Sequence, residues 1–161
     1  MALAIMKILT PTPGQSAQRF EKETDQTLHV AVVFTTFAAT LVALKQAGDL
    51  ASNLGARISL FAAHVVPYPM TLEAPQVPPR FYEDRLRLLA RESAHEMSAY
   101  ILLCRDDFEA LTSALTPGSI VVLGGPRRRW TGRWTWWPTK EQQLARRLQS
   151  EGYQVLFSEM E

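Results

Sequence analysis

Short apolar runs alternate along this chain with longer segments of helical periodicity, and this alternation constrains the fold more than any other feature. The runs are Leu28–Thr35, Arg57–Val66, Ala99–Leu103, Ser119–Leu123 and Tyr153–Phe157. Strands that are nearly continuous in apolar character are typical of a parallel sheet covered on both faces. The sequence therefore predicts a three-layer α/β/α sandwich with a five-stranded parallel sheet and right-handed crossovers.

The four segments between these runs are predicted to be helices. The first covers Phe37–Leu54, where an apolar stripe recurs at steps of three and four, and Gly55 is placed to end it. The second runs from about Phe81 to Met97 and the third over Asp107–Leu115. The last opens with the capping-box pattern of Thr139 followed by Gln142 three residues later.

Length and charge limit the classes of protein that this chain can belong to. With 161 residues, 47% of them hydrophobic, it fits one globular domain. The formal net charge of +1 gives no global attraction to nucleic acid or anionic lipid. No apolar run is long enough to span a membrane, and Met1–Thr10 lacks the features of a signal peptide, so we expect a cytoplasmic protein.

The single cysteine and the three histidines offer little chemistry. Cys104 lies in an apolar run and is expected to be a small buried residue, not a reactive thiol. His64 ends a strand and is expected to be structural, while His29 and His95 have no companion ligands at metal spacing. For the adjacent acids Asp106 and Asp107, the expected role is to cap the start of a helix. The sequence supports no metal site and no catalytic residue, and it favours a non-enzymatic protein.

Residues 1–27 are interpreted as an N-terminal arm, and residues 28–161 as the domain. The tip of the arm, Met1–Leu9, is apolar, and Thr10–Gly14 interrupts any regular structure. Exposed apolar side chains are unfavourable in water, so docking of this tip on the domain or on a second copy is favoured over a loose tail.

The order of elements and the amino-acid sequences of three strands resemble those of the universal stress protein family. The resemblance covers Leu28 to about Ser158, and its best points are Val30–Thr35, Ala63–Pro67 and Ile120–Gly124. It implies a fold of the adenine nucleotide alpha hydrolase-like type, with a flavodoxin-like or nucleotidyl-transferase-like domain as the competing alternative. It also implies a homodimer that pairs through the C-terminal strand at 153–157.

Family members that bind ATP carry an acidic residue after the first strand and the motif Gly-x2-Gly-x9-Gly-Ser/Thr after the fourth. Here the first of these positions falls near Phe34. Counted from Gly124, the later motif positions hold Arg127, Trp137 and Pro138. Counted from Gly125, they hold Arg128, Pro138 and Thr139. Most of the glycines that would let the main chain approach phosphates are missing, which argues against ATP binding in the family manner.

A loop rich in arginine and tryptophan replaces this motif. All four tryptophans of the protein and four of its arginines lie within residues 127–137. One interpretation is a structural cap or a protein interface. A second is a site for a nucleotide or another anion, with arginines on phosphate and indoles on a base. A single-stranded nucleic-acid groove is the third, although the rest of the chain is not basic.

The residues that could line a ligand cleft gather at the predicted carboxyl edge of the sheet, where ligands of such folds bind. These candidate binding residues are Thr35, Thr36, Val65, Gly124, Gly125, Arg127, Arg128 and Thr139. The resulting hypothesis is a universal stress protein-like binding or regulatory module without a resident cofactor. ATP or another anionic ligand at the arginine loop is its alternative.

Overall fold

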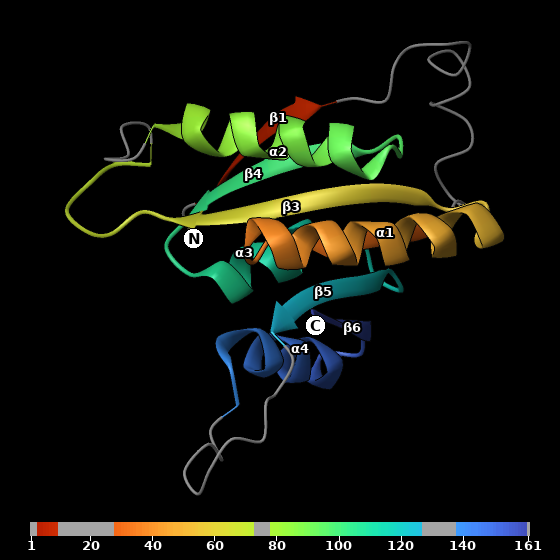
Figure 1. The fold of residues 1–161 in the computed structure, drawn as a ribbon. Coiled ribbons are helices and arrows are strands. Elements are labelled where there is room, and N and C mark those ends of the chain that lie inside the picture. Colours follow the sequence, from red (N-terminus) through yellow and green to blue (C-terminus); the bar gives the residue numbers. More distant parts are fainter. Residues whose placement is uncertain (1–2, 10–27, 73–77, 127–137, 161) are drawn as a thin grey trace, which may run out of the picture.

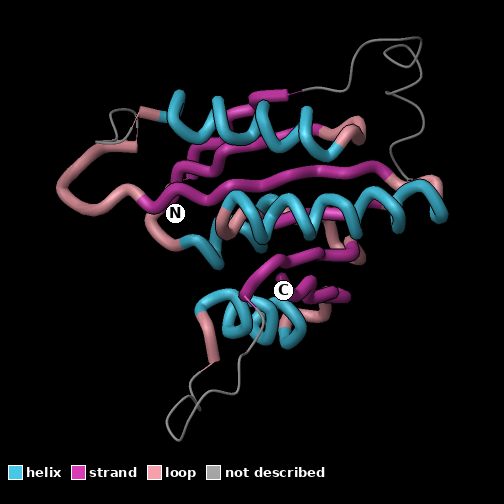
Figure 2. The backbone as a smooth tube through the Cα atoms, in the orientation of Figure 1, coloured by secondary structure: helices cyan, strands magenta, loops and turns pink. Residues whose placement is uncertain are grey.

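The computed structural model describes residues 3–9, 28–72, 78–126 and 138–160, which form one mixed sheet with helices packed against it (Figure 1). The strands are β1 (Leu3–Leu9), β2 (His29–Val33), β3 (Arg57–Val65), β4 (Ser98–Cys104), β5 (Ile120–Pro126) and β6 (Gln154–Met160). The helices are α1 (Phe37–Leu54), α2 (Pro79–Ser93), α3 (Asp107–Ala114) and α4 (Lys140–Ser150). Figure 2 traces how helices and strands alternate after β1.

Strands β2 to β6 pair in parallel, as the apolar runs predict. The order across the sheet is β1-β4-β3-β2-β5-β6. The predicted count of five strands is wrong, because β1 pairs antiparallel with β4, from Leu3 opposite Cys104 to Leu9 opposite Ala99. Without this strand, the main-chain groups along the outer edge of β4 would have no partner in the sheet. The apolar tip of the arm therefore becomes an edge strand.

The two faces of the sheet hold separate cores, and alternate residues of each strand contribute to one or the other. Val30 and Val32 of β2 pack in a cluster with buried residues of α1 and α2. Ala31 and Val33 pack in a second cluster with residues of α3 and α4. The order of layers is therefore α/β/α, as predicted.

The largest differences from the predicted boundaries are in α2, β5 and β6. Helix α2 begins at Pro79 and ends at Ser93, because Ala94 takes up a left-handed conformation with φ of 55°. Met97 is thus not on this helix, although it is buried. Strand β5 does not stop at the glycines: Gly124 and Gly125 pair with Ser158 and Glu159 of β6. Strand β6 likewise continues beyond the predicted segment to Met160.

The predicted ends of two helices are confirmed. Gly55 ends α1 with φ of 63°, a conformation that glycine adopts without steric cost. Thr139 and Gln142 form the capping box at the start of α4, each accepting a hydrogen bond from the other residue's main-chain N–H.

Candidate functional site

The carboxyl ends of β2 and β5 lie side by side at the point where the strand order reverses. In sheets of this kind, such a switch point is where ligands bind. Here the Thr35 hydroxyl donates a hydrogen bond to the Gly124 carbonyl oxygen at 2.7 Å, and the Thr35 N–H donates to Thr40 Oγ1 at 3.1 Å. The structure thus brings together two of the candidate binding residues and bonds them to each other.

The first turn of α1 packs directly on Gly124. A β-carbon added to Gly124 would lie 2.0 Å from the Ala39 carbonyl oxygen. A β-carbon on Gly125 would lie 2.5 Å from Cζ of Phe157 on β6. Gly124 is therefore required by the contact between helix and strand, whereas the sequence analysis connected it with the approach of a phosphate.

Thr36 and Thr139 both use their hydroxyls to cap helices. Thr36 Oγ1 accepts from the Ala39 N–H at 3.3 Å, and Thr139 Oγ1 accepts from the Gln142 N–H at 3.2 Å. Each hydroxyl satisfies a main-chain donor that the start of a helix leaves free. These two candidates are thus held at the ends of α1 and α4 by local structure.

An aromatic cluster surrounds Phe34, the position at which the family resemblance would place an acid. Phe34 packs edge-on against Tyr82 of α2, with ring centroids 6.4 Å apart. The Tyr82 hydroxyl lies 3.3 Å from His64 Nδ1, a single partner that fits a structural histidine. Burial lowers the pKa of His64, so its neutral form is favoured. This corner of the sheet offers aromatic rings, and the residues that directly follow β2, Phe34 to Thr36, bring no carboxylate to it.

Of Val65, Arg127 and Arg128, the structure describes Val65 alone. Val65 ends β3 with 46% of its surface exposed, while Val66 beside it is buried. Arg127, Arg128 and the rest of the arginine and tryptophan loop at 127–137 lie outside the described residues. Every expectation for that loop therefore stays a prediction.

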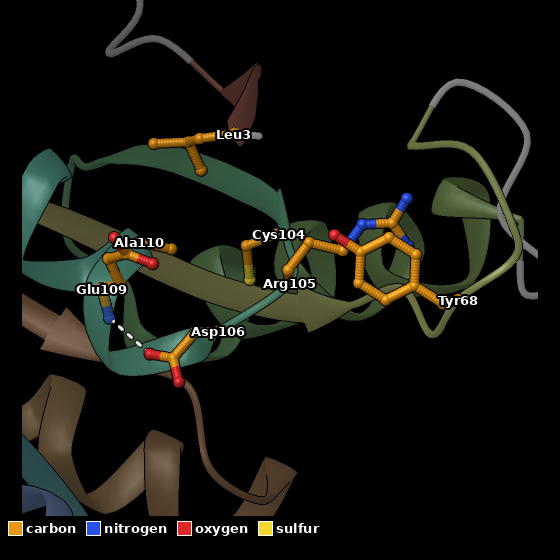
Figure 3. Close-up of a pocket in the computed structure, with 7 residues that line it drawn as sticks. All are labelled: Leu3, Tyr68, Cys104, Arg105, Asp106, Glu109 and Ala110. Atoms are coloured by element: carbon orange, nitrogen blue, oxygen red, sulfur yellow. Dashed lines mark hydrogen bonds between the residues drawn. The ribbon is translucent and has the colours of Figure 1, made fainter. Parts of the chain in front are cut away.

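A pocket that the sequence analysis did not identify opens at the carboxyl end of β4 (Figure 3). Its volume is about 270 Å³. It is lined by Leu3, Tyr68, Cys104, Arg105, Asp106, Glu109 and Ala110. The adjacent acids after β4 are the local sequence feature that could have indicated this pocket. Asp106 Oδ1 accepts from the Glu109 N–H at 2.8 Å, which confirms the expected N-cap.

Arg105 holds the loop that follows β3. Its two terminal nitrogens donate to the carbonyl oxygens of Val66 and Met70, at 2.7 and 2.6 Å. The guanidinium also stacks 4.1 Å from the centroid of the Tyr68 ring. Its Nε is buried and has no hydrogen-bond partner in the described part of the chain. Arg105 thus fixes this loop through its terminal nitrogens, while its Nε–H has no acceptor in the described part of the chain.

Cys104 is buried, as predicted, and its thiol donates to the His64 carbonyl oxygen at 3.7 Å. Burial, reinforced by the charges of Asp107 and Asp106, raises the pKa of Cys104 to about 11. The thiol therefore stays protonated near neutral pH and is a poor nucleophile.

Among the described residues, no group of three or more histidine, cysteine or acidic side chains is placed to hold a metal ion. No helix in the same residues is both long and apolar enough to cross a membrane.

Comparisons with known proteins give distant structural matches and no match by sequence. The sequence matches no protein-family model and no curated protein. Among solved structures, the chain is similar to "a protein from the universal stress protein family from Burkholderia pseudomallei". The two share 17% sequence identity over 80% of this chain and 93% of the other, with a TM-score of 0.49. The relation to that family therefore remains a resemblance in the order of elements and in the sequences of the strands.

Proposed function

We propose that this protein is a universal stress protein-like binding or regulatory module that does not hold ATP as the ATP-binding members do. The observation that carries the proposal is that the described residues at the switch point bond to and pack against one another. The Thr35 hydroxyl is bonded to the Gly124 carbonyl, and the Ala39 carbonyl fills the space over Gly124. Phe34, packed on Tyr82, supplies no acid to a ligand.

A regulatory module fits the chemistry of the described residues better than an enzyme does. The thiol of Cys104 is protonated, and His64 faces only a tyrosine hydroxyl. Neither arrangement provides a nucleophile together with a base that activates it. We place the module in the cytoplasm and propose that it forms a homodimer through β6, the parallel edge strand of the sheet.

The proposal is tested by thermal unfolding of the full chain with and without ATP. A site with a dissociation constant near 10 μM would add roughly 2.7 kcal/mol at 1 mM ligand. That raises the melting temperature of a chain of this size by roughly 5–10 °C. We expect a shift below about 1 °C with ATP. A shift of several degrees that persists in Arg127→Ala and Arg128→Ala variants would contradict the proposal.

Tryptophan fluorescence separates the two alternatives from the proposal, because all four indoles lie at 130–137. Quenching by ATP that Arg127→Ala or Arg128→Ala weakens would indicate an anion site in the loop. Quenching by single-stranded DNA with steep salt dependence would indicate a nucleic-acid groove. The proposal predicts that neither ligand changes the tryptophan fluorescence.

A further inference from the structure

The pocket at the end of β4 is a separate feature from the switch point. It is built by β1, the loop after β3, the end of β4 and the first turn of α3, whereas the switch point lies between β2 and β5. Two strand spacings, about 10 Å, separate β4 from β2 within the sheet. A ligand in this pocket is therefore independent of any nucleotide at the switch point.

We propose that this pocket binds a small organic cation that has an apolar or aromatic body and a hydrogen-bond acceptor. Its volume of about 270 Å³ equals that of roughly nine waters. This is just below the usual range for sites of drug-sized ligands, about 300–1,000 Å³. A molecule of one ring with a short polar chain matches that space.

The charge of the lining sets the sign of the ligand. Asp106 and Glu109 bring two carboxylates from the start of α3, and both residues are exposed. Among the described residues of the lining, Arg105 is the single cation, so these residues carry an excess of negative charge. The two terminal nitrogens of Arg105 each already donate to a carbonyl oxygen, that of Val66 or Met70, so part of the hydrogen-bonding capacity of this cation is used within the chain. An amine is therefore favoured over an acid.

The other walls accept an apolar body. Leu3, Cys104 and Ala110 bring aliphatic or sulfur surface, and Tyr68, with 80% of its surface exposed, brings a ring at the mouth. The buried Nε–H of Arg105 lacks an acceptor in the described part of the chain. Because an unpaired buried donor is costly, an oxygen of the ligand would improve binding by accepting from this N–H. That bond requires the exposed Tyr68 ring, which stacks on the guanidinium, to move aside.

The test uses nuclear magnetic resonance titration of the ¹⁵N-labelled full chain with four matched probes. Phenylalaninamide carries the cation, the ring and the acceptor. In 3-phenylpropanamide the amine is missing, in 2-phenylethylamine the acceptor is missing, and 3-phenylpropanoate reverses the charge. At mildly acidic pH, where both amines are protonated, we expect phenylalaninamide to shift the amides of Cys104 to Ala110. A dissociation constant of roughly 1 mM is expected for a fragment of this size. The other three probes should bind more weakly, and the anion weakest.

Variants locate the site. Glu109→Gln and Asp106→Asn each remove one charge, and asparagine retains the N-cap. Each should weaken phenylalaninamide binding roughly two- to fivefold, and added salt should reduce the difference. The control is Asp107→Asn, which removes the same charge from the same turn outside the pocket. The proposal is overturned if no pocket amide shifts, if the anion binds as well as the cation, or if Asp107→Asn weakens binding as much as Glu109→Gln.

Discussion

Gly124 shows how one missing side chain sets the distance between two elements. The Ala39 carbonyl of α1 occupies the space that any β-carbon at this position would need. Backbone atoms of a helix cannot move aside as the end of a side chain can, so the constraint is rigid. Gly125 is a useful contrast, because its neighbour is the tip of the Phe157 ring.

We therefore predict that Gly124→Ala lowers the free energy of unfolding by about 2–3 kcal/mol, the usual range for overpacking. Gly125→Ala should cost about 1 kcal/mol, because the ring of Phe157 can rotate away. Urea denaturation without any ligand measures both values. Equal losses in the two variants would show that α1 does not press on Gly124.

Single residues also show how far the sequence could predict the site. The caps at Thr36, Asp106 and Thr139 follow from spacing, since each bond joins residues three positions apart. The roles of Gly124 and Arg105 depend on elements that are far away in the chain. No local pattern records which helix will press on a glycine or which loop an arginine will hold.

At the scale of elements, β1 is the least expected part of the fold. Its pattern alternates: Met6 packs against the core shared with α2, while Ile5 on the opposite face is 54% exposed. A shift of one residue would exchange the two faces, so this alternation specifies the register against β4.

We predict that Met6→Lys detaches β1 from the sheet, whereas Ile5→Lys leaves it in place. Met6 is half-buried, so a lysine there loses apolar contact and partly desolvates its charge, at a cost of roughly 2 kcal/mol. Hydrogen exchange of the β4 amides is the measurement, with Ile5→Lys as the matched control. Faster exchange in Met6→Lys alone is expected. Equal exchange in both variants would contradict the register.

The sequence could predict the five parallel strands but not the sixth, and the reason lies at this scale. Apolar runs that alternate with helical segments have few possible arrangements, since crossovers are right-handed and neighbours in sequence pair. An apolar tip before a polar segment has many possible arrangements, because it can pair with either edge of the sheet, cover a face or join a second copy. Only the position of the free edge of β4 decides among them.

For the molecule as a whole, the two sheet edges differ in kind. One edge is the antiparallel β1 and the other is β6, whose Leu156 is 37% exposed. In the described sheet β6 pairs with β5 on one side, and an apolar parallel edge favours pairing with a second copy on the other.

We predict a dimer in light scattering at concentrations in the tens of micromolar, and a monomer for Leu156→Lys. A lysine at an edge opposes pairing because its charge would lie against the neighbouring side chains of the added strand and lose part of its hydration. Leu88→Lys on α2, where Leu88 is 45% exposed, adds the same charge away from β6 and should leave the dimer intact. A wild-type monomer at that concentration would contradict the proposed homodimer.

The pairing of Leu3 with Cys104 joins positions about a hundred residues apart, and this has a consequence for biosynthesis. During translation, β1 leaves the ribosome before its partner strand exists. It can take its place only after β4 has emerged and paired with β3. Long-range pairings of this kind form slowly, so the β4 edge stays open in the meantime. That interval is when aggregation of the nascent protein would begin, and chaperone binding would protect it most then.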